Sequence, residues 1–286
     1  MSKQIKNPQD HFPGVSENPR KGVSRPYPMY VSQTGLIDED QHWWQERHVG
    51  GAPFGMLQFP ANIPMIPGNP GNAYSFPCPV IFHRVEGIDI HRMMTGTASQ
   101  SDMDKWIAGA KYLEEQGVRA IGANCGFLTN TIEAVNKAVS VPYYPSAVLQ
   151  IPLLLNLFPK SAKVMVITYA DKQDMIDFGT LGGAGVREED YERLVVTGGK
   201  TSTQWARSAS LAGEFNAHLW QEEVVEIAVS SIRENPDIAA IVQECTELPP
   251  FSWAVQRATG LPVFDTLTGM KHMISAVTQT PYHGHI

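Results

Sequence analysis

The sequence is poor in features that would each mark a class of protein: it has three cysteines and no long apolar run. Three cysteines cannot form a disulfide framework, and an odd number argues against an oxidising compartment. The longest nearly unbroken apolar run is IPLLLNLF at 151–158, far shorter than the roughly 20 residues that span a bilayer. The first residues, MSKQIKNPQDHFPG, carry charges and lack the apolar region of a secretory signal. We therefore expect a cytoplasmic protein with no membrane contact.

Basic residues are also scarce. The chain has 22 Lys and Arg against 29 Asp and Glu, which gives a formal net charge of −7 and a pI near 5.7. A chain of this sign has no general attraction for a phosphate backbone, and no cluster of Lys and Arg overrides the overall charge. We therefore expect no nucleic acid partner.

Signatures of nucleotides, metals and coenzymes are missing as well. No GxGxxG or GxxxxGK(S/T) motif follows a strand, and no lysine stands in a context typical of a Schiff base. His283 and His285 have the spacing of metal ligands, but they lack a third ligand and are more typical of a frayed terminus. We therefore expect no cofactor and no bound metal.

The chain changes character after its first fifty or so positions. Residues 1–53 are rich in Pro, Gly and polar residues, which indicates an extended arm on the body or on a partner subunit of a homo-oligomer. A partly ordered tail is the alternative interpretation. From Phe54 onward short apolar runs alternate with amphipathic stretches, the pattern of an α/β fold.

One arrangement occurs twice along this part. An amphipathic helix (101–117, then 221–235) is followed by an apolar strand (118–124, then 237–244) that runs directly into a cysteine. The local sequences are RAIGANCGF and AAIVQECTEL. The repetition predicts two pseudo-symmetric Rossmann-like lobes with parallel sheets, each with a cysteine at the strand edge where ligands bind. We expect the active site in the cleft between the lobes.

Cys125 and Cys245 at these positions favour proton transfer. Free backbone N–H groups and helix dipoles at a strand–helix junction stabilise a thiolate, so we expect at least one of the two thiols to be ionised near neutral pH. The same N–H groups can hold a carboxylate or a developing enolate. One sulfur would take a proton from carbon and the other would supply one. The alternative is that both cysteines only fill space, as we expect for Cys78 in its Pro-rich segment.

Two segments carry a family resemblance. IVQECTELPPFSWAVQRATGLPVFDTLT (241–268) and RAIGANCGFLTNTIEAV (119–135) resemble the aspartate/glutamate racemase superfamily. Within it, the closest branch contains the algal-type dimethylsulfoniopropionate (DMSP) lyases and their bacterial relatives. Amino-acid racemases usually have Cys-Asn-Thr in the first segment, whereas this chain has Cys125-Gly126-Phe127, as the lyase-like branch does.

The resemblance implies a cofactor-independent enzyme whose substrate is a small carboxylate. Its first lobe would comprise 54–145 plus 262–286, and its second lobe 146–261. Cys125 and Cys245 would be the acid/base pair. The residues that would line the substrate are Asn124, Gly126, Phe127, Thr168, Thr246 and Glu247. Glu247 has an alternative interpretation as a cap of the following helix.

The reaction is left open at this point. Racemisation or epimerisation of a small amino acid or related carboxylate uses both cysteines, and we expect this reaction first. The alternative is the β-elimination of DMSP lyases, which releases dimethyl sulfide and acrylate. A two-lobed small-molecule binder without catalysis is the remaining possibility, against which the presence of both cysteines argues.

Overall fold

The computed structural model describes residues 50–61, 63–199, 202–209, 215–280 and 282. Most of the predicted arm (1–53) and the two histidines of the C-terminal tail, His283 and His285, lie outside the described residues. Within them, no helix is long and apolar enough to cross a membrane.

The strands form two parallel sheets of four strands each. The first sheet contains β1 (Phe54–Gln58), β2 (Val80–Arg84), β3 (Ala120–Ala123) and β4 (Tyr143–Tyr144). The second sheet contains β5 (Lys163–Thr168), β6 (Leu194–Gly198), β7 (Ile238–Gln243) and β8 (Val263–Phe264). The strand order is β2-β1-β3-β4 in the first sheet and β6-β5-β7-β8 in the second, so the same arrangement occurs twice. The predicted fold class, two similar α/β lobes with parallel sheets, is confirmed.

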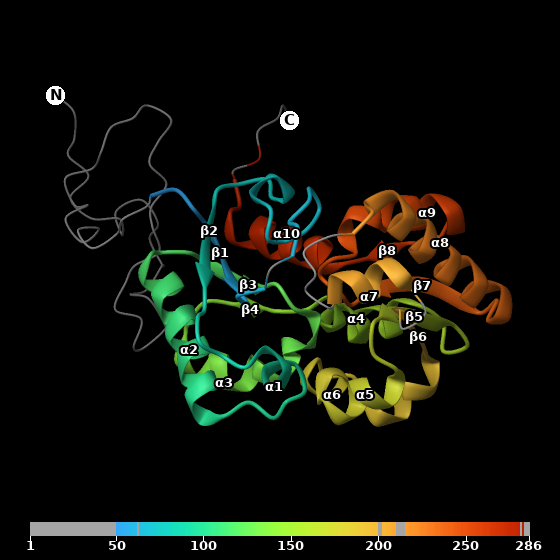
Figure 1. Ribbon diagram of the computed structural model, residues 1–286, viewed down its shortest axis with the longest axis horizontal. Coiled ribbons are helices and arrows are strands. Elements are labelled where there is room, and N and C mark those ends of the chain that lie inside the picture. The colour runs from blue at the N-terminus through green and yellow to red at the C-terminus, as the bar shows by residue number, and fades with distance from the viewer. Residues whose placement is uncertain (1–49, 62, 200–201, 210–214, 281, 283–286) are drawn as a thin grey trace. The chain divides into compact units, whose positions relative to one another are not determined.

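Helices connect the strands and cover both faces of each sheet (Figure 1). The α-helices are α1 (Ile90–Met94), α2 (Gln100–Glu115), α3 (Ile132–Ala138), α4 (Ile151–Leu157), α5 (Lys172–Asp177), α6 (Thr180–Gly183), α7 (Thr203–Ala209), α8 (Ala217–Glu234), α9 (Ser252–Thr259) and α10 (Thr266–Val277).

Alternation along β1 decides how the first sheet is covered. Successive side chains of a strand point to opposite faces. Phe54 and Met56 therefore lie on one face, in a cluster with Met270 of α10, whereas Leu57 packs on the other face with Trp106 of α2. Figure 1 shows α2 and α3 on one side of this sheet and α10 on the other.

The second sheet follows the same rule through β5. Met165 and Ile167 point toward α7 and α8, where they pack with Trp205 and Trp220. Val166 points to the opposite face and belongs to the same cluster as Leu57 of the first sheet. The two lobes therefore share one continuous apolar core.

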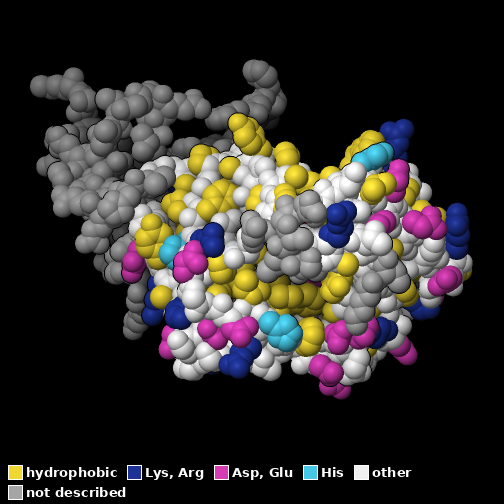
Figure 2. Space-filling model, viewed as in Figure 1, with side chains coloured by type: hydrophobic (Ala, Val, Ile, Leu, Met, Phe, Trp, Pro, Cys, Tyr) yellow, Lys and Arg dark blue, Asp and Glu magenta, His cyan; other side chains and the backbone are white. Residues whose placement is uncertain are grey.

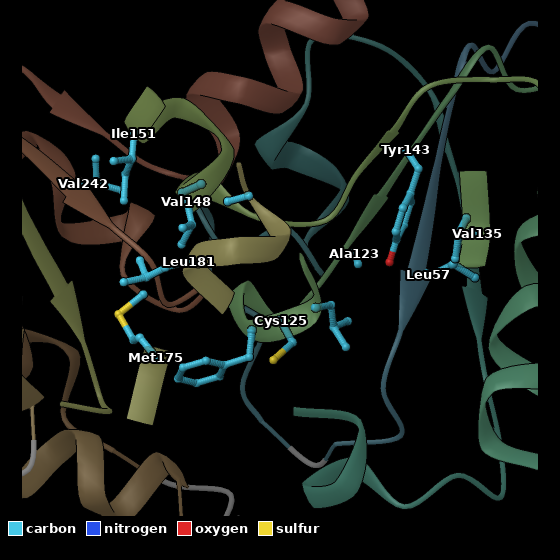
Figure 3. Packing of buried hydrophobic residues seen from close by; sticks show 14 of the residues in the cluster. Leu57, Ala123, Cys125, Val135, Tyr143, Val148, Ile151, Met175, Leu181 and Val242 are labelled. Atoms are coloured by element: carbon cyan, nitrogen blue, oxygen red, sulfur yellow. The ribbon is translucent and has the colours of Figure 1, made fainter. Parts of the chain in front are cut away.

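Cys125 lies within this shared core. Figure 3 shows it between Leu57 and Ala123 of the first sheet on one side and Met175 and Leu181 of α5 and α6 on the other. Its position at the junction of the lobes follows from its place directly beyond β3.

The end of the chain returns to the first lobe. α10 packs on the face of the first sheet that carries Phe54 and Met56. Its Gly269 lies so close to Tyr144 of β4 that a methyl group there would overlap the phenol. β8 still pairs with β7, which favours a crossing between lobes after Phe264. The predicted boundary at residue 262 stays a prediction.

Candidate active site

The two cysteines follow equivalent strands. Cys125 comes just after β3 and Cys245 just after β7, and each of these strands lies beside the strand that begins its lobe, β1 or β5. In both sheets the next strand in sequence, β2 or β6, lies on one side of that first strand, and the strand after it, β3 or β7, lies on the other side. Open α/β sheets bind ligands at such a switch point, outside the carboxyl ends of the strands.

Contacts between the two cysteine loops pair their residues in opposite directions. The hydroxyl of Thr246 donates a hydrogen bond to the carbonyl oxygen of Asn124, at 2.7 Å. Gly126 lies against Glu244, so closely that a methyl group at position 126 would overlap both the carbonyl and the carboxyl of Glu244. The triplets Asn124-Cys125-Gly126 and Glu244-Cys245-Thr246 therefore run past each other in opposite directions, as segments related by a local two-fold axis do. Cys125 and Cys245 are the middle residues of the two triplets.

The residue before each cysteine is anchored to the central strand of its own lobe. Asn124 Oδ1 accepts the backbone N–H of Phe59, at 2.8 Å. Glu244 Oε2 accepts the hydroxyl proton of Thr168, also at 2.8 Å. The two anchors have corresponding positions in the repeated fold, but they differ in chemistry. The first lobe uses a neutral amide and the second a carboxyl group.

Both thiols are harder to ionise than a free cysteine. Burial raises the pKa of Cys125, and the carboxylate of Glu244 raises it further, while the backbone N–H of Phe127 acts in the opposite direction. Burial also raises the pKa of Cys245, and the negative charges of Glu247 and Glu244 raise it further. The expectation of a thiolate near neutral pH is therefore wrong for this structure.

Burial is the main cause of that error, and the helices also begin farther from the sulfurs than the sequence predicts. The sequence pattern predicts helices over 128–139 and 249–260, close to the sulfurs. Instead each cysteine is followed by a turn of 3₁₀ helix, Gly126–Thr131 or Pro249–Phe251. The α-helix starts only at Ile132 in the first lobe and at Ser252 in the second. Since the dipole effect fades within one turn, the N-terminal charge of these helices does little at the sulfurs.

Glu247 is a second acid beside the pair. Its Oε1 accepts the hydroxyl proton of Ser208 on α7, at 2.7 Å. Burial raises the pKa of Glu247 to about 6, although the Ser208 hydrogen bond opposes that shift. The 3₁₀ turn after it has no side-chain cap, so Glu247 does not act as the helix cap that the sequence offered as an alternative.

Aromatic and apolar side chains surround the sulfurs. Phe127 of the first lobe packs edge-on against Phe178 of the second, with ring centroids 5.8 Å apart. In the space-filling view hydrophobic side chains gather between the lobes beside α7, and acidic side chains border them (Figure 2).

The structure brings most of the predicted site residues together. Both cysteines, Asn124, Gly126 and Thr246 belong to the paired triplets described above. The catalytic and binding roles of all these residues stay predictions.

Two buried residues depart from what the sequence suggested. Thr168 lies behind Glu244 and has no exposed surface. Glu244, also fully buried, was missed by the sequence reasoning. The available signal was a charged residue at the end of the apolar strand DIAAIVQE (237–244).

The remaining candidates lie elsewhere. Cys78 packs beside the cluster between α10 and the first sheet, and burial raises its pKa. Among the described residues, no group of three His, Cys, Asp or Glu side chains is arranged to hold a metal ion.

The proteins of known name that this chain is similar to are enzymes. No protein-family model matches it. The chain is 25% identical to dimethylsulfoniopropionate lyase 7 of Emiliania huxleyi over 236 residues, which is 80% of this chain and 68% of that protein. It is also 25% identical to a dimethylsulfoniopropionate lyase of Durusdinium sp. clade D over 244 residues, 84% of this chain and 80% of that one.

Solved structures share the fold at lower identity. A mutant of arylmalonate decarboxylase matches 78% of this chain and 92% of its own, with a TM-score of 0.52 and 17% identity. The aspartate racemase of Picrophilus torridus matches 79% of this chain and 94% of its own, with a TM-score of 0.51 and 16% identity. The expected resemblance to the aspartate/glutamate racemase superfamily and its DMSP lyase branch is confirmed. The sequence relatives are lyases, and the solved structures show the shared fold.

Proposed function

We propose that this chain, with the fold of the aspartate/glutamate racemase superfamily and DMSP lyases as sequence relatives, is a cofactor-independent lyase. It removes a proton next to a carboxylate and expels a β-sulfonium group. The observation that carries the proposal is the pairing of the two cysteine triplets, which sets Cys125 opposite Cys245 between the lobes. A single substrate carbon can then meet a sulfur on either side.

The reaction proceeds by loss of a proton and of dimethyl sulfide. A thiolate takes a proton from Cα of DMSP and becomes a thiol. The electron pair of the C–H bond forms the Cα–Cβ double bond, and the Cβ–S bond breaks with its electron pair leaving on sulfur. The products are acrylate, dimethyl sulfide and the protonated cysteine, which returns its proton to water. Because Cα–H next to a carboxylate is a very weak acid, stabilisation of the enolate-like state contributes more than the base alone.

Elimination is favoured over racemisation by two observations. The sequence relatives reported above are DMSP lyases, and their similarity extends over at least 80% of this chain. The segment after the first cysteine, Gly126-Phe127, lacks the polar side chains with which a racemase would hold an α-amino acid. The apolar, aromatic surroundings of the sulfurs suit a substrate that carries methyl groups on sulfur.

Racemisation remains the second candidate because both cysteines occupy matched positions. A two-base reaction on opposite faces of one carbon uses both thiols, whereas an elimination can proceed with one base. The paired triplets are compatible with either reaction.

One assay in deuterated water separates the two reactions. The protein is incubated with DMSP, aspartate and glutamate in separate vessels, with headspace gas chromatography for dimethyl sulfide and mass spectrometry of recovered substrate. We expect dimethyl sulfide and acrylate in equal amounts from DMSP, and no deuterium in either amino acid. Deuterium at Cα of an amino acid with loss of chirality, and no sulfide from DMSP, would contradict the elimination and favour the racemase.

A further inference from the structure

Glu244 is an acid where a buried apolar residue would be expected. It follows directly on the apolar strand β7 and precedes Cys245. Its exposed fraction is 0%, and its Oε1 has no hydrogen-bond partner among the described residues. An unpartnered buried carboxylate costs several kcal/mol, so a carboxyl group in this position needs a function or a proton.

The hydrogen bonds around Thr168 locate that proton. The Thr168 hydroxyl oxygen accepts the backbone N–H of Ala170, at 3.3 Å, and its own proton goes to Glu244 Oε2. Since Oε2 already accepts a hydrogen bond, the acidic proton of a neutral Glu244 resides on Oε1. This is the oxygen that has no other partner.

The same oxygen points at the paired triplets. A methyl group added to Gly126 would overlap Glu244 Oε1 as well as the Glu244 carbonyl oxygen. The carboxyl group therefore occupies the space that a side chain at position 126 would fill, next to Cys125. In sequence Glu244 is also next to Cys245, and its negative charge raises the pKa of both thiols.

The charges around Glu244 do not favour a carboxylate. The titratable groups that share its electrostatic environment are Cys125 beyond β3, Cys245 on its own loop and Glu247, all of which become anionic. Among the described residues, no Lys, Arg or His lowers the pKa of Glu244. Burial raises this pKa, and the Thr168 hydrogen bond lowers it. A neutral acid avoids the repulsion.

We propose that Glu244 is a positioning residue that keeps its proton on Oε1, which makes no hydrogen bond in this structure, and donates that proton as a hydrogen bond to a thiolate of the cysteine pair once one forms. The proposal rests on the proposed function for its purpose, because it assumes that a thiolate is the base. It assigns to Glu244 no contact with substrate. A buried carboxylic acid kept neutral so that it can donate a hydrogen bond has a precedent in ketosteroid isomerase.

The proposal has a pH signature. Burial raises the pKa of Glu244 to about 7, opposed only by the Thr168 hydrogen bond. Below that pH the neutral acid donates to the thiolate. Above it the carboxylate adds negative charge beside both sulfurs and raises their pKa further. Thiol reactivity should therefore rise less steeply above neutral pH than that of an isolated cysteine.

Alkylation of the sulfurs tests this without any substrate. Iodoacetamide rates at Cys125 and Cys245 are followed by mass spectrometry from pH 6 to 9, in a Cys78→Ala background. Glu244→Gln mimics the neutral acid, with its amide N–H₂ in place of the O–H. We expect it to match the parent at pH 6 and to react on the order of tenfold faster at pH 8, one pKa unit of difference. Glu244→Met, which keeps the size but has no donor, should react more slowly than the parent at pH 6.

A second variant should shift the pH at which the alkylation rate levels off, instead of removing that change in slope. The Thr168 hydrogen bond stabilises the carboxylate, so Thr168→Val raises the pKa of Glu244 and shifts the flattening of the rate profile to higher pH. The matched control is Asp265→Asn, which neutralises another buried acid but keeps the N-cap of α10 and leaves the profile unchanged.

Two results would overturn the proposal. Glu244→Gln with the parent's profile at every pH would mean that the carboxyl only fills space. Glu244→Gln that is slower at every pH would mean that Glu244 takes the thiol proton as a base. Neither result depends on turnover. A protein that alkylates as expected but converts no DMSP would contradict the proposed reaction alone.

Discussion

A thiol beside two carboxyl groups releases its proton only at a cost, and this applies to the buried Cys125 and to the partly buried Cys245. In the proposed reaction, the positive charge of a sulfonium substrate near the sulfurs would lower the pKa of the thiols. On that proposal the thiols keep their protons in the empty site, and one of them becomes the base when substrate binds.

Removal of either sulfur tests its chemical role. At least one of the variants Cys125→Ala and Cys245→Ala, the one that removes the base, should lower kcat with DMSP by at least about a hundredfold, the usual contribution of a positioned acid or base. The free energy of unfolding should change by only about 1 kcal/mol, because each thiol takes part in a single backbone hydrogen bond, with the N–H of Phe127 or of Glu247. Steady-state kinetics and denaturant titration measure the two effects.

The control for that experiment is Cys78→Ala, whose sulfur packs by α10. It should retain the parent's kcat. If Cys78→Ala were the damaging change and the other two were tolerated, the assignment of the sulfurs would be wrong.

The hydrogen bond between the triplets can be removed without changing shape. Thr246→Val takes away the donor to the partly buried carbonyl of Asn124 and should destabilise the protein by about 1–3 kcal/mol. It should also lower kcat, because the two sulfurs lose part of their alignment. Thr278→Val removes a similar hydroxyl, one that donates to Ile274 within α10, and should leave kcat unchanged. Equal loss of kcat in both variants would contradict a specific role for the link between the triplets.

At the scale of elements, the seating of α10 on the first sheet depends on a glycine. Gly269→Ala would bring a methyl group onto the Tyr144 phenol and push the helix away from β4. Overpacking of this kind costs about 1–3 kcal/mol, which thermal or denaturant unfolding would detect.

A matched glycine lies in open space. Gly182 in α6 has no atom within 4 Å of an added Cβ. Gly182→Ala should therefore stabilise the protein, by about 0.5–1 kcal/mol, since alanine favours a helix. Stabilisation by Gly269→Ala as well would show that α10 tolerates displacement.

The sequence could predict the elements that carry strong patterns. The strands that end at Cys125 and Cys245, and the long helices before them, have apolar runs or helical periodicity over many residues. β4 was not predicted, since Tyr143–Tyr144 is a two-residue strand between prolines. The 3₁₀ turns after the cysteines were not predicted either, because their residues also suit an α-helix.

The candidate site also has residues that the sequence could identify and contacts that it could not. The cysteines could be found because each ends an apolar strand in a repeated context. The pairing of Asn124 with Thr246 and of Gly126 with Glu244 could not, because it joins residues more than a hundred positions apart. The protonation of Glu244 depends on burial, which only the assembled lobes determine.

At the scale of the whole molecule, Glu244 links folding to pH. Its pKa is raised to about 7 in the folded protein, so the folded state binds its proton more tightly than the unfolded chain does. Its contribution to stability is therefore complete below about pH 4 and is lost as pH rises toward 7. The expected loss is about 3 kcal/mol, from about 1.4 kcal/mol per pKa unit.

The difference between the parent and Glu244→Gln isolates this contribution. Urea unfolding at pH 5 and pH 8 should show the parent losing more stability than the variant over this interval. Equal pH dependence in the two proteins would mean that Glu244 has an ordinary pKa in the fold.

The return of α10 to the first sheet also bears on how the protein is made. β1 is translated first, but the apolar face with Phe54 and Met56 is covered by a helix that is translated more than two hundred residues later. As the chain leaves the ribosome, the first lobe therefore waits with one side of its sheet bare while the second lobe is synthesised. Contacts between such distant segments form slowly, and an uncovered sheet is prone to aggregate in the meantime. The second lobe can form before α10 has emerged, whereas the sheet of the first lobe is covered only once α10 has been made.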